Sequence, residues 1–134
     1  EFIYSYKHGT GTVHWTKLSS GEQFSHTLPQ FKFYDYCSWC ALPQEQIYFT
    51  GGYPTTNAVV SFDRKSLTLT QRPPMLSPRS QHNSVYSGGY LYAIGGLNGP
   101  TSIALCERFS VESNKWEAIP PLPLDVAQHS AIVQ

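Results

Sequence analysis

The sequence predicts an all-β fold, and three observations support this prediction. Glycine, proline and tyrosine are frequent, with 10, 10 and 9 copies among 134 residues, which favours short strands joined by turns. Hydrophobic residues make up 40% of the chain and charged residues only 13%, so the chain can build a core and does not resemble a disordered segment. A recurring motif of about 44 residues is typical of stacked repeat units.

Charge and hydropathy exclude several classes of partner. The formal net charge is zero, and there is no cluster of Lys and Arg of the kind that neutralises phosphates, so neither nucleic acid nor an anionic membrane surface is a predicted partner. No apolar stretch approaches the roughly 20 residues that a membrane-spanning helix needs. The three cysteines are an odd number and make no disulfide framework, which favours a reducing, cytoplasmic location.

Two double glycines mark the internal repeat. Gly51-Gly52 and Gly95-Gly96 lie 44 positions apart, and each follows a strand-like segment, 46–50 or 90–94. Apolar side chains on both faces of these segments predict buried strands. Further pairs match at a spacing of 47, after three extra residues in the second copy: Phe62 with Phe109, Leu69 with Trp116, Pro73-Pro74 with Pro120-Pro121, and Gln81-His82 with Gln128-His129.

Each copy contains four candidate strands. In the second copy they cover about 82–86, 90–94, 103–109 and 115–119, with a tight hairpin predicted at Ser87-Gly88-Gly89. A four-stranded meander at this period predicts one blade of a β-propeller. We therefore expect a partial propeller of four-stranded antiparallel blades, about two full blades plus flanking strands.

The same alignment predicts how the chain is divided. The expected parts are the end of one blade at 1–18, a long inter-blade loop at 19–36, a blade at 37–72, a blade at 82–119, and the first strand of a next blade at 128–134. An added strand at 31–34 is possible within the long loop. Because isolated repeat units cannot bury their faces alone, we expect the chain to belong to a longer protein, or else to complete its ring with other copies.

Two motifs resemble the kelch repeat. Gly-Tyr-Leu-Tyr-Ala-Ile-Gly-Gly at 89–96 and Asn-Lys-Trp at 114–116 are similar to the family consensus, and the resemblance covers about residues 37–134. The first copy departs from it, with Leu69 in place of Trp and Gln44-Glu45 in place of hairpin glycines. In this family the glycines allow neighbouring sheets to approach closely, and we expect Trp116 to fill the wider gap between blades.

Candidate catalytic and metal-binding residues have structural interpretations. Cys37-Ser38-Trp39-Cys40 has the spacing of zinc and redox sites, but on a strand its two thiols face opposite sides about 10 Å apart. Cys106 aligns with Val59 and is expected to be a small buried hydrophobe. His82 and His129 share one repeat position, which predicts a hydrogen bond to a loop carbonyl between blades. No motif of a hydrolase, phosphate-binding loop or metalloprotease occurs, so no enzyme activity, metal or cofactor is predicted.

The resemblance also implies where a partner would bind. Kelch adaptors grip partner peptides with residues just after the double glycine and with an Arg between blades. The matching positions here are Tyr53, Leu97, Asn98 and Arg79. Arg79 could hold a carboxylate with its guanidinium group, or it could simply be a solvated surface residue, and Tyr53 could equally be a packing aromatic.

The predicted function is therefore a non-catalytic protein-interaction module that displays loops to a partner protein or peptide. The resemblance suggests a substrate adaptor or scaffold, with cytoskeletal or ubiquitin-ligase components as possible partners. One alternative is part of a propeller enzyme, such as a galactose-oxidase-like or sugar-processing enzyme, whose ligands would lie outside this chain. Another is an architectural component of a large cytoskeletal assembly.

Overall fold

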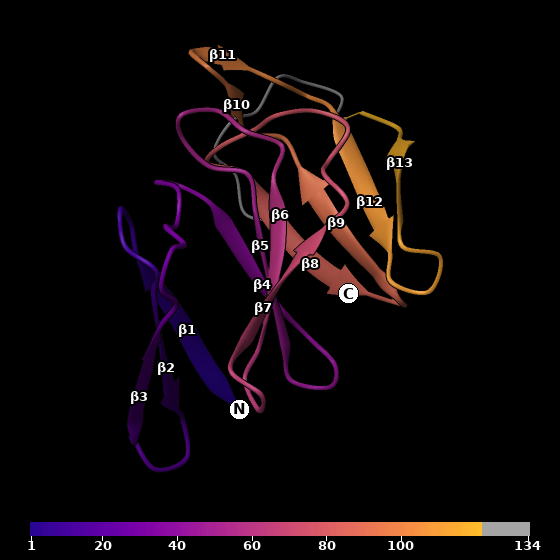
Figure 1. Cartoon of the computed structure of the whole chain (residues 1–134). Coiled ribbons are helices and arrows are strands. Elements are labelled where there is room, and N and C mark those ends of the chain that lie inside the picture. Colours follow the sequence, from indigo (N-terminus) through magenta and orange to yellow (C-terminus); the bar gives the residue numbers. More distant parts are fainter. Residues whose placement is uncertain (122–134) are drawn as a thin grey trace. The chain divides into compact units, whose positions relative to one another are not determined.

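The computed structural model describes residues 1–121. All the regular secondary structure in this range consists of β-strands (Figure 1). The predicted all-β class is confirmed. None of the described residues forms a helix long and apolar enough to cross a membrane. The chain divides into two compact units, one of residues 1–35 and one that begins at Tyr36. The strand predicted at 128–134 lies outside the described residues.

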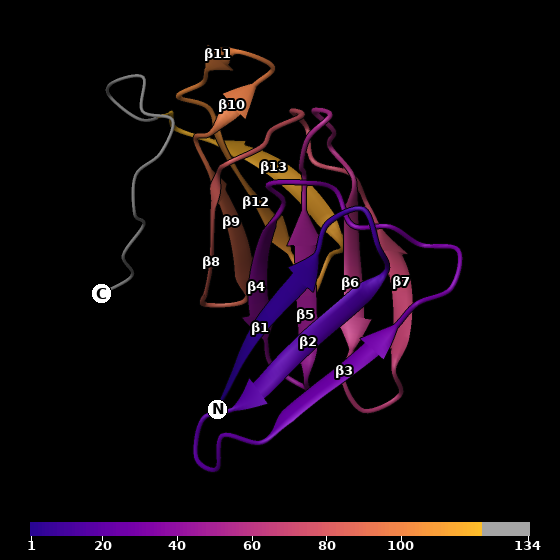
Figure 2. The ribbon, with the colours of Figure 1, turned by 90° about the vertical axis from the view of Figure 1, so that its left-hand side faces the viewer.

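The first unit is a three-stranded antiparallel sheet of β1 (Phe2–Lys7), β2 (Thr12–Lys17) and β3 (Gln23–Thr27), in that order (Figure 2). The sequence predicted a long loop at 19–36 with a possible strand at 31–34, and this prediction is wrong. The strand lies at β3, where Phe24 pairs with Trp15 and stacks on its ring at 5.8 Å. Residues 31–34 are irregular, and Phe33 is buried against Tyr6.

The second unit contains two four-stranded sheets, and the first of them is a simple meander. Its strands are β4 (Ser38–Leu42), β5 (Gln46–Thr50), β6 (Val59–Asp63) and β7 (Thr68–Arg72), each antiparallel to the next. Four consecutive residues of β5, Ile47 to Thr50, are buried. The predicted burial of both faces of this strand is confirmed.

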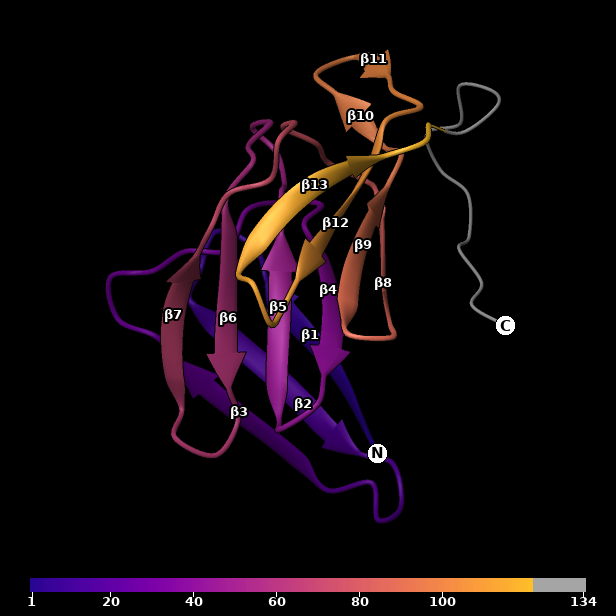
Figure 3. The same cartoon turned by 90° about the vertical axis from the view of Figure 1, so that its right-hand side faces the viewer.

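The second sheet repeats the topology with β8 (Asn83–Ser87), β9 (Tyr90–Ile94), β12 (Cys106–Ser110) and β13 (Lys115–Ile119) (Figure 3). The third strand begins at Cys106 and not at 103 as predicted. The intervening chain forms a small hairpin instead, β10 (Leu97–Asn98) with β11 (Thr101–Ser102). Its turn includes Gly99 at φ 63°, a left-handed conformation that glycine adopts without steric cost.

The two sheets share one register, as the repeat requires. Phe62 lies between Ile47 and Leu69 in the first sheet. At the corresponding position of the second sheet, Phe109 lies between Leu91 and Trp116. The sequence alignment therefore placed equivalent side chains at equivalent points of the two sheets.

A hydrophobic cluster joins the facing sides of the two sheets. Phe109 is almost fully buried, with its ring 5.3 Å from that of Trp116 and 5.9 Å from that of Tyr48 on the other sheet. The indole N–H of Trp116 donates to the carbonyl of Pro73, in the linker between the sheets, at 2.8 Å. The predicted role of Trp116 in filling the gap between blades is confirmed. The cluster consists of Leu42, Tyr48, Val59, Met75, Leu91, Ala93, Phe109 and Trp116.

The double glycines sit where the linker passes closest to the strand ends. A Cβ on Gly51 would lie 2.1 Å from the carbonyl oxygen of Arg79, and one on Gly96 would lie 2.6 Å from that of Ser80. Both glycines also have positive φ values, 65° and 95°. Any larger residue would force the linker away from the sheets, which explains why the motif uses glycine.

Candidate partner-binding surface

Three segments meet at one end of the second unit, which we call the loop end: the β5–β6 loop (51–58), the linker (73–81) and the hairpin (97–102) (Figures 1 and 3). The linker lies between the other two. Its Arg79 N–H donates to Thr56, and its Arg79 carbonyl accepts from the Gly52 N–H at 2.9 Å. Ser80 exchanges two hydrogen bonds of 2.9 Å with Leu97 of the hairpin.

A direct contact completes this arrangement. The N–H of Gly99 in the hairpin donates to the Thr55 hydroxyl of the β5–β6 loop at 3.0 Å. The three segments therefore form one hydrogen-bonded surface, because each of them is bonded to the other two. Loops held in this way by a rigid sheet are a common place for binding residues.

Three of the four predicted site residues lie on this loop end. Tyr53 is 55% exposed, Asn98 is exposed, and Leu97 is partly buried by its pairing with Ser80. The hydrogen bonds between their segments bring Tyr53 and Asn98 to the same end of the unit. Their contact with a partner stays a prediction.

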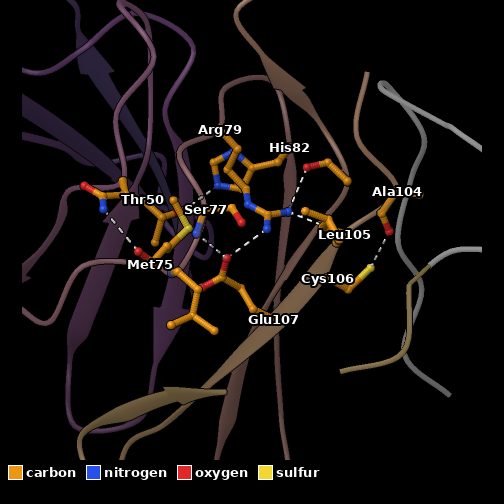
Figure 4. Close-up of polar contacts among 12 residues, drawn as sticks. Thr50, Met75, Ser77, Arg79, His82, Ala104, Leu105, Cys106 and Glu107 are labelled. Atoms are coloured by element: carbon orange, nitrogen blue, oxygen red, sulfur yellow. Dashed lines mark hydrogen bonds and ion pairs between the residues drawn. The ribbon is translucent and has the colours of Figure 1, made fainter. Parts of the chain in front are cut away.

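The fourth residue, Arg79, corrects the sequence-based prediction. Its side chain has no exposed surface, so it is neither a partner contact nor a solvated surface residue. One terminal amine forms an ion pair of 2.8 Å with the Glu107 carboxylate. The other donates to the carbonyls of Gly95 and Leu105, both at 2.9 Å (Figure 4). Arg79 does hold a carboxylate, but one that belongs to its own chain.

Glu107 is the residue that sequence reasoning missed. Its carboxylate is buried and accepts the backbone N–H groups of Leu76 at 2.6 Å and Ser77 at 3.1 Å, in addition to the Arg79 guanidinium (Figure 4). A buried charge is stable only when it is paired and hydrogen-bonded in this way. The available signal was a mismatch in the repeat, because Glu107 aligns with the apolar Val60 of the first copy.

His82 packs beside this ion pair. Its Nε2 forms a hydrogen bond of 2.7 Å with the Thr50 hydroxyl, which links the linker region to the first sheet. The structural role predicted for His82 is present, but the partner is a strand hydroxyl and not a loop carbonyl. Burial, together with the positive charge of Arg79, lowers the pKa of His82 to about 3. The ring is therefore neutral at physiological pH. Its repeat counterpart, His129, lies outside the described residues.

A comparison with known families identifies the repeat. The family model described as "Kelch motif" matches residues 78–123. Kelch-like protein 35 from Mus musculus is 34% identical over 109 residues, which cover 81% of this chain and 17% of that protein. The chain belongs to the kelch-repeat family. Human Kelch-like protein 23 is 30% identical over 134 residues, covering 96% of this kelch chain and 24% of the relative.

One further relative and one solved structure are also similar to this chain. Human "Kelch repeat and BTB domain-containing protein 2" is 32% identical over 83 residues, covering 60% of this kelch chain and 13% of that protein. The solved "Structure of YjhT" superposes with a TM-score of 0.61 at 19% identity, covering 70% of this chain and 30% of that one. This likeness concerns the fold alone. It supports, with the two antiparallel sheets, the predicted partial β-propeller of four-stranded blades. The chain thus spans a quarter or less of the curated relatives described here.

The cysteines of this kelch chain occupy structural positions. Burial raises the pKa of the Cys40 thiol to about 11, so the thiol is a poor nucleophile at neutral pH. Cys106 is buried, as predicted, with its thiol directed to the Ala104 carbonyl. Among residues 1–121, no three His, Cys, Asp or Glu side chains lie close enough together to hold a metal ion.

Proposed function

We propose that this kelch chain is a non-catalytic protein-interaction module that binds a partner protein through its loop end. The observation that carries the proposal is the hydrogen-bonded junction of the β5–β6 loop, the linker and the hairpin. This junction is held in place by the sheets, and Tyr53 and Asn98 on it are exposed to solvent. A preorganised surface of this kind lowers the entropy cost of association.

The exposed side chains suit the recognition of a polypeptide. Tyr53 offers a large apolar ring with a hydroxyl at its edge, and tyrosine is enriched among residues that dominate binding energy. Asn98 supplies both a donor and an acceptor. The short β10–β11 hairpin adds backbone groups at the same end. We expect an extended peptide segment or a loop of the partner to lie across these residues.

The charged groups beneath the surface support a non-catalytic role. Glu107 forms an ion pair with Arg79 and accepts two N–H groups of the linker, and neither side chain has more than 2% exposure. A neutral His82 is bonded to Thr50. A general acid or base must reach its substrate, and these groups are occupied in holding the linker. The partly buried Cys40 and the buried Cys106, which form no disulfide, fit a reducing, cytoplasmic location.

The names of the relatives suggest the cellular setting. Two are Kelch-like proteins, and one is named for a kelch repeat together with a BTB domain. We propose that the protein acts as an adaptor or scaffold, with the loop end selecting the partner. Ubiquitin-ligase or cytoskeletal components are the partners we expect it to connect.

The test is affinity capture of cell proteins, followed by direct binding of the recovered partner to purified variants. The Tyr53→Ala/Asn98→Ala double variant should weaken the partner affinity at least about tenfold, because such contacts contribute on the order of 1–2 kcal/mol each. The control is Leu67→Asn, which changes a 38% exposed apolar residue in the β6–β7 turn, at the opposite end of the same unit. Equal affinity of the double variant and the control would reject the loop end as the binding surface.

A further inference from the structure

A second concave site lies between the two sheets of the second unit, and none of its lining residues belongs to the three segments of the loop end. It is a cavity of about 410 Å³, within the range of volumes that hold small molecules. Leu42, Tyr48 and Arg72 line it from the first sheet, and Tyr86 lines it from the second. Gln44 and Val111, in turns at the opposite end from the loop end, also line it, as do Pro43 and Gln46. Its surface is therefore part apolar and part polar.

Arg72 differs from the other arginines of the chain. Arg64, Arg79 and Arg108 each form an ion pair with a glutamate, namely Glu45, Glu107 and Glu117. Within residues 1–121, Arg72 has no carboxylate within ion-pair distance. It is also the arginine that lines the cavity. A guanidinium group in a partly apolar cavity without a counter-charge favours an anionic ligand.

The guanidinium group of Arg72 is already oriented. Its Nε–H donates to the Ser61 hydroxyl at 2.8 Å, and its Cζ lies 5.5 Å from the centre of the Tyr48 ring. These contacts fix the plane of the guanidinium group and use its Nε–H as a donor to the protein. The two terminal amines remain to receive a ligand as a pair, and their spacing matches the two oxygens of a carboxylate.

The surroundings limit the charge of the ligand. Asp63 accepts a hydrogen bond of 2.7 Å from Gln46, another residue of the cavity lining. Glu45, next to Gln44 in the same turn, is paired with Arg64. Arg72 is the one charged side chain that lines the cavity among residues 1–121, so the lining offers a single positive charge to a ligand. A single negative charge therefore suits the site best.

We propose that this inter-sheet cavity is a binding site for a small organic monocarboxylate that carries an aromatic or aliphatic group. The carboxylate binds the terminal amines of Arg72. The apolar group packs against Leu42, Tyr48 and Tyr86, and Val111 lies at the cavity edge. Since neither Tyr53 nor Asn98 lines the cavity, this site is distinct from the proposed partner surface.

The test uses phenylacetate as the probe and its neutral isostere phenylacetamide as the comparison, each titrated into the protein and followed by NMR chemical shifts. We expect phenylacetate to bind with a Kd of about 1 mM or below, with shifts at the cavity residues. Phenylacetamide should bind at least about tenfold more weakly because it lacks the charge. Absence of phenylacetate binding, or equal binding of the two compounds, would overturn the proposal.

Two variants assign the binding to this cavity. Val111→Asp adds a like charge at a 43% exposed position, so it should leave the fold intact and weaken phenylacetate binding about tenfold or more. Arg72→Gln should do the same by removing the attracting charge. The matched control is Leu105→Asp, at a 51% exposed position outside the cavity lining, which should leave the affinity unchanged. Unchanged binding to Val111→Asp would place the ligand elsewhere and reject the site.

Discussion

The two four-stranded sheets have the same topology and register, but they differ in whether a side chain of the third strand binds the linker. The first sheet carries the apolar Val60 on β6, and at the matching position of β12 the second carries Glu107. Glu107 binds Arg79 and two linker N–H groups. The kelch model matches residues 78–123, which include the second sheet but not the first.

This difference shows which sheet fixes the linker. The linker leaves the first sheet after β7, yet its turn at 76–79 is held by a carboxylate from the following sheet. The hydrogen bond from the Trp116 indole N–H to the Pro73 carbonyl of the linker acts in the same direction. We infer that the loop end is ordered mainly by the second sheet, and the following predictions test this inference.

Glu107→Ala should have one of the two largest effects on stability. It would remove the acceptor of two linker N–H groups and leave the Arg79 charge buried without a counter-ion. Breaking a buried ion pair from one side costs about 3–5 kcal/mol, and we expect a loss of that size in urea unfolding. The control is Glu117→Ala, which breaks the exposed pair with Arg108 and should cost less than about 1 kcal/mol. Similar losses for the two variants would contradict a special role for Glu107.

Trp116→Ala and Leu69→Ala change equivalent positions of the two sheets. Trp116 is 9% exposed and packs on Phe109, so its truncation should cost about 3–5 kcal/mol. Leu69 is only partly buried, and its truncation should cost about 1–2 kcal/mol. Chemical denaturation of both variants measures the difference. A loss for Leu69→Ala as large as that for Trp116→Ala would show that the sheets depend equally on this position.

The buried His82 predicts a dependence of stability on pH. Its pKa is about 3 in the folded state, against an ordinary value of 6.5, so the unfolded chain binds the proton more readily. The stability is therefore fully present above pH 6.5 and falls as the pH decreases toward 3, by on the order of 1.4 kcal/mol per pH unit where only the unfolded state is protonated.

Thermal unfolding between about pH 6.5 and 5 isolates this effect, because ordinary carboxylates titrate lower. The His82→Gln variant should lose most of the pH dependence seen in the wild-type protein in this window. The same pH dependence of stability in both proteins would contradict the burial of a neutral His82 in the folded state.

The hairpin turns of the two sheets give the smallest predicted effect. Gly88 and Gly89 form the β8–β9 turn with positive φ, and Gln44 and Glu45 adopt φ values of 62° and 61° in the β4–β5 turn. A left-handed conformation costs a non-glycine residue about 1–2 kcal/mol, partly offset by the greater unfolded-state entropy of glycine. Gln44→Gly should therefore stabilise the protein by about 0.5–1 kcal/mol.

The reverse change, Gly88→Gln, serves as the matched experiment. A Cβ at Gly88 would meet no atom within 4 Å, so the substitution measures the backbone cost without a steric clash. It should destabilise the protein by a similar amount in the same unfolding assay. A stabilising Gly88→Gln would show that the turn residues are not limited by their φ values.

The sequence predicted the sheets well because their signals are local and repeated. The spacing of the glycine pairs and of Phe62 and Phe109 determined the strands and their register, which follow from burial on alternating faces. The Trp116 contact could also be predicted, since a large aromatic at a fixed repeat position must fill space between sheets.

The sequence did not predict the features that have no equivalent in another copy of the repeat. Strand β3 has no equivalent in the repeat, and its position depends on the stacking of Phe24 on Trp15. The pairing of Arg79 with Glu107 joins positions 28 residues apart, and neither residue has a charged equivalent in the other copy. A repeat alignment emphasises what the copies share, so it could not reveal this pair.

Hydrogen exchange in wild type and Glu107→Gln tests most directly whether the second sheet orders the loop end. The isosteric change removes the charge but keeps one carbonyl acceptor. We predict that protection of the Leu76 and Ser77 amides falls at least about tenfold, and that of Gly52 and Leu97 also falls, relative to amides within β5 and β9. Unchanged protection at Leu76 and Ser77, relative to those strands, would contradict the account.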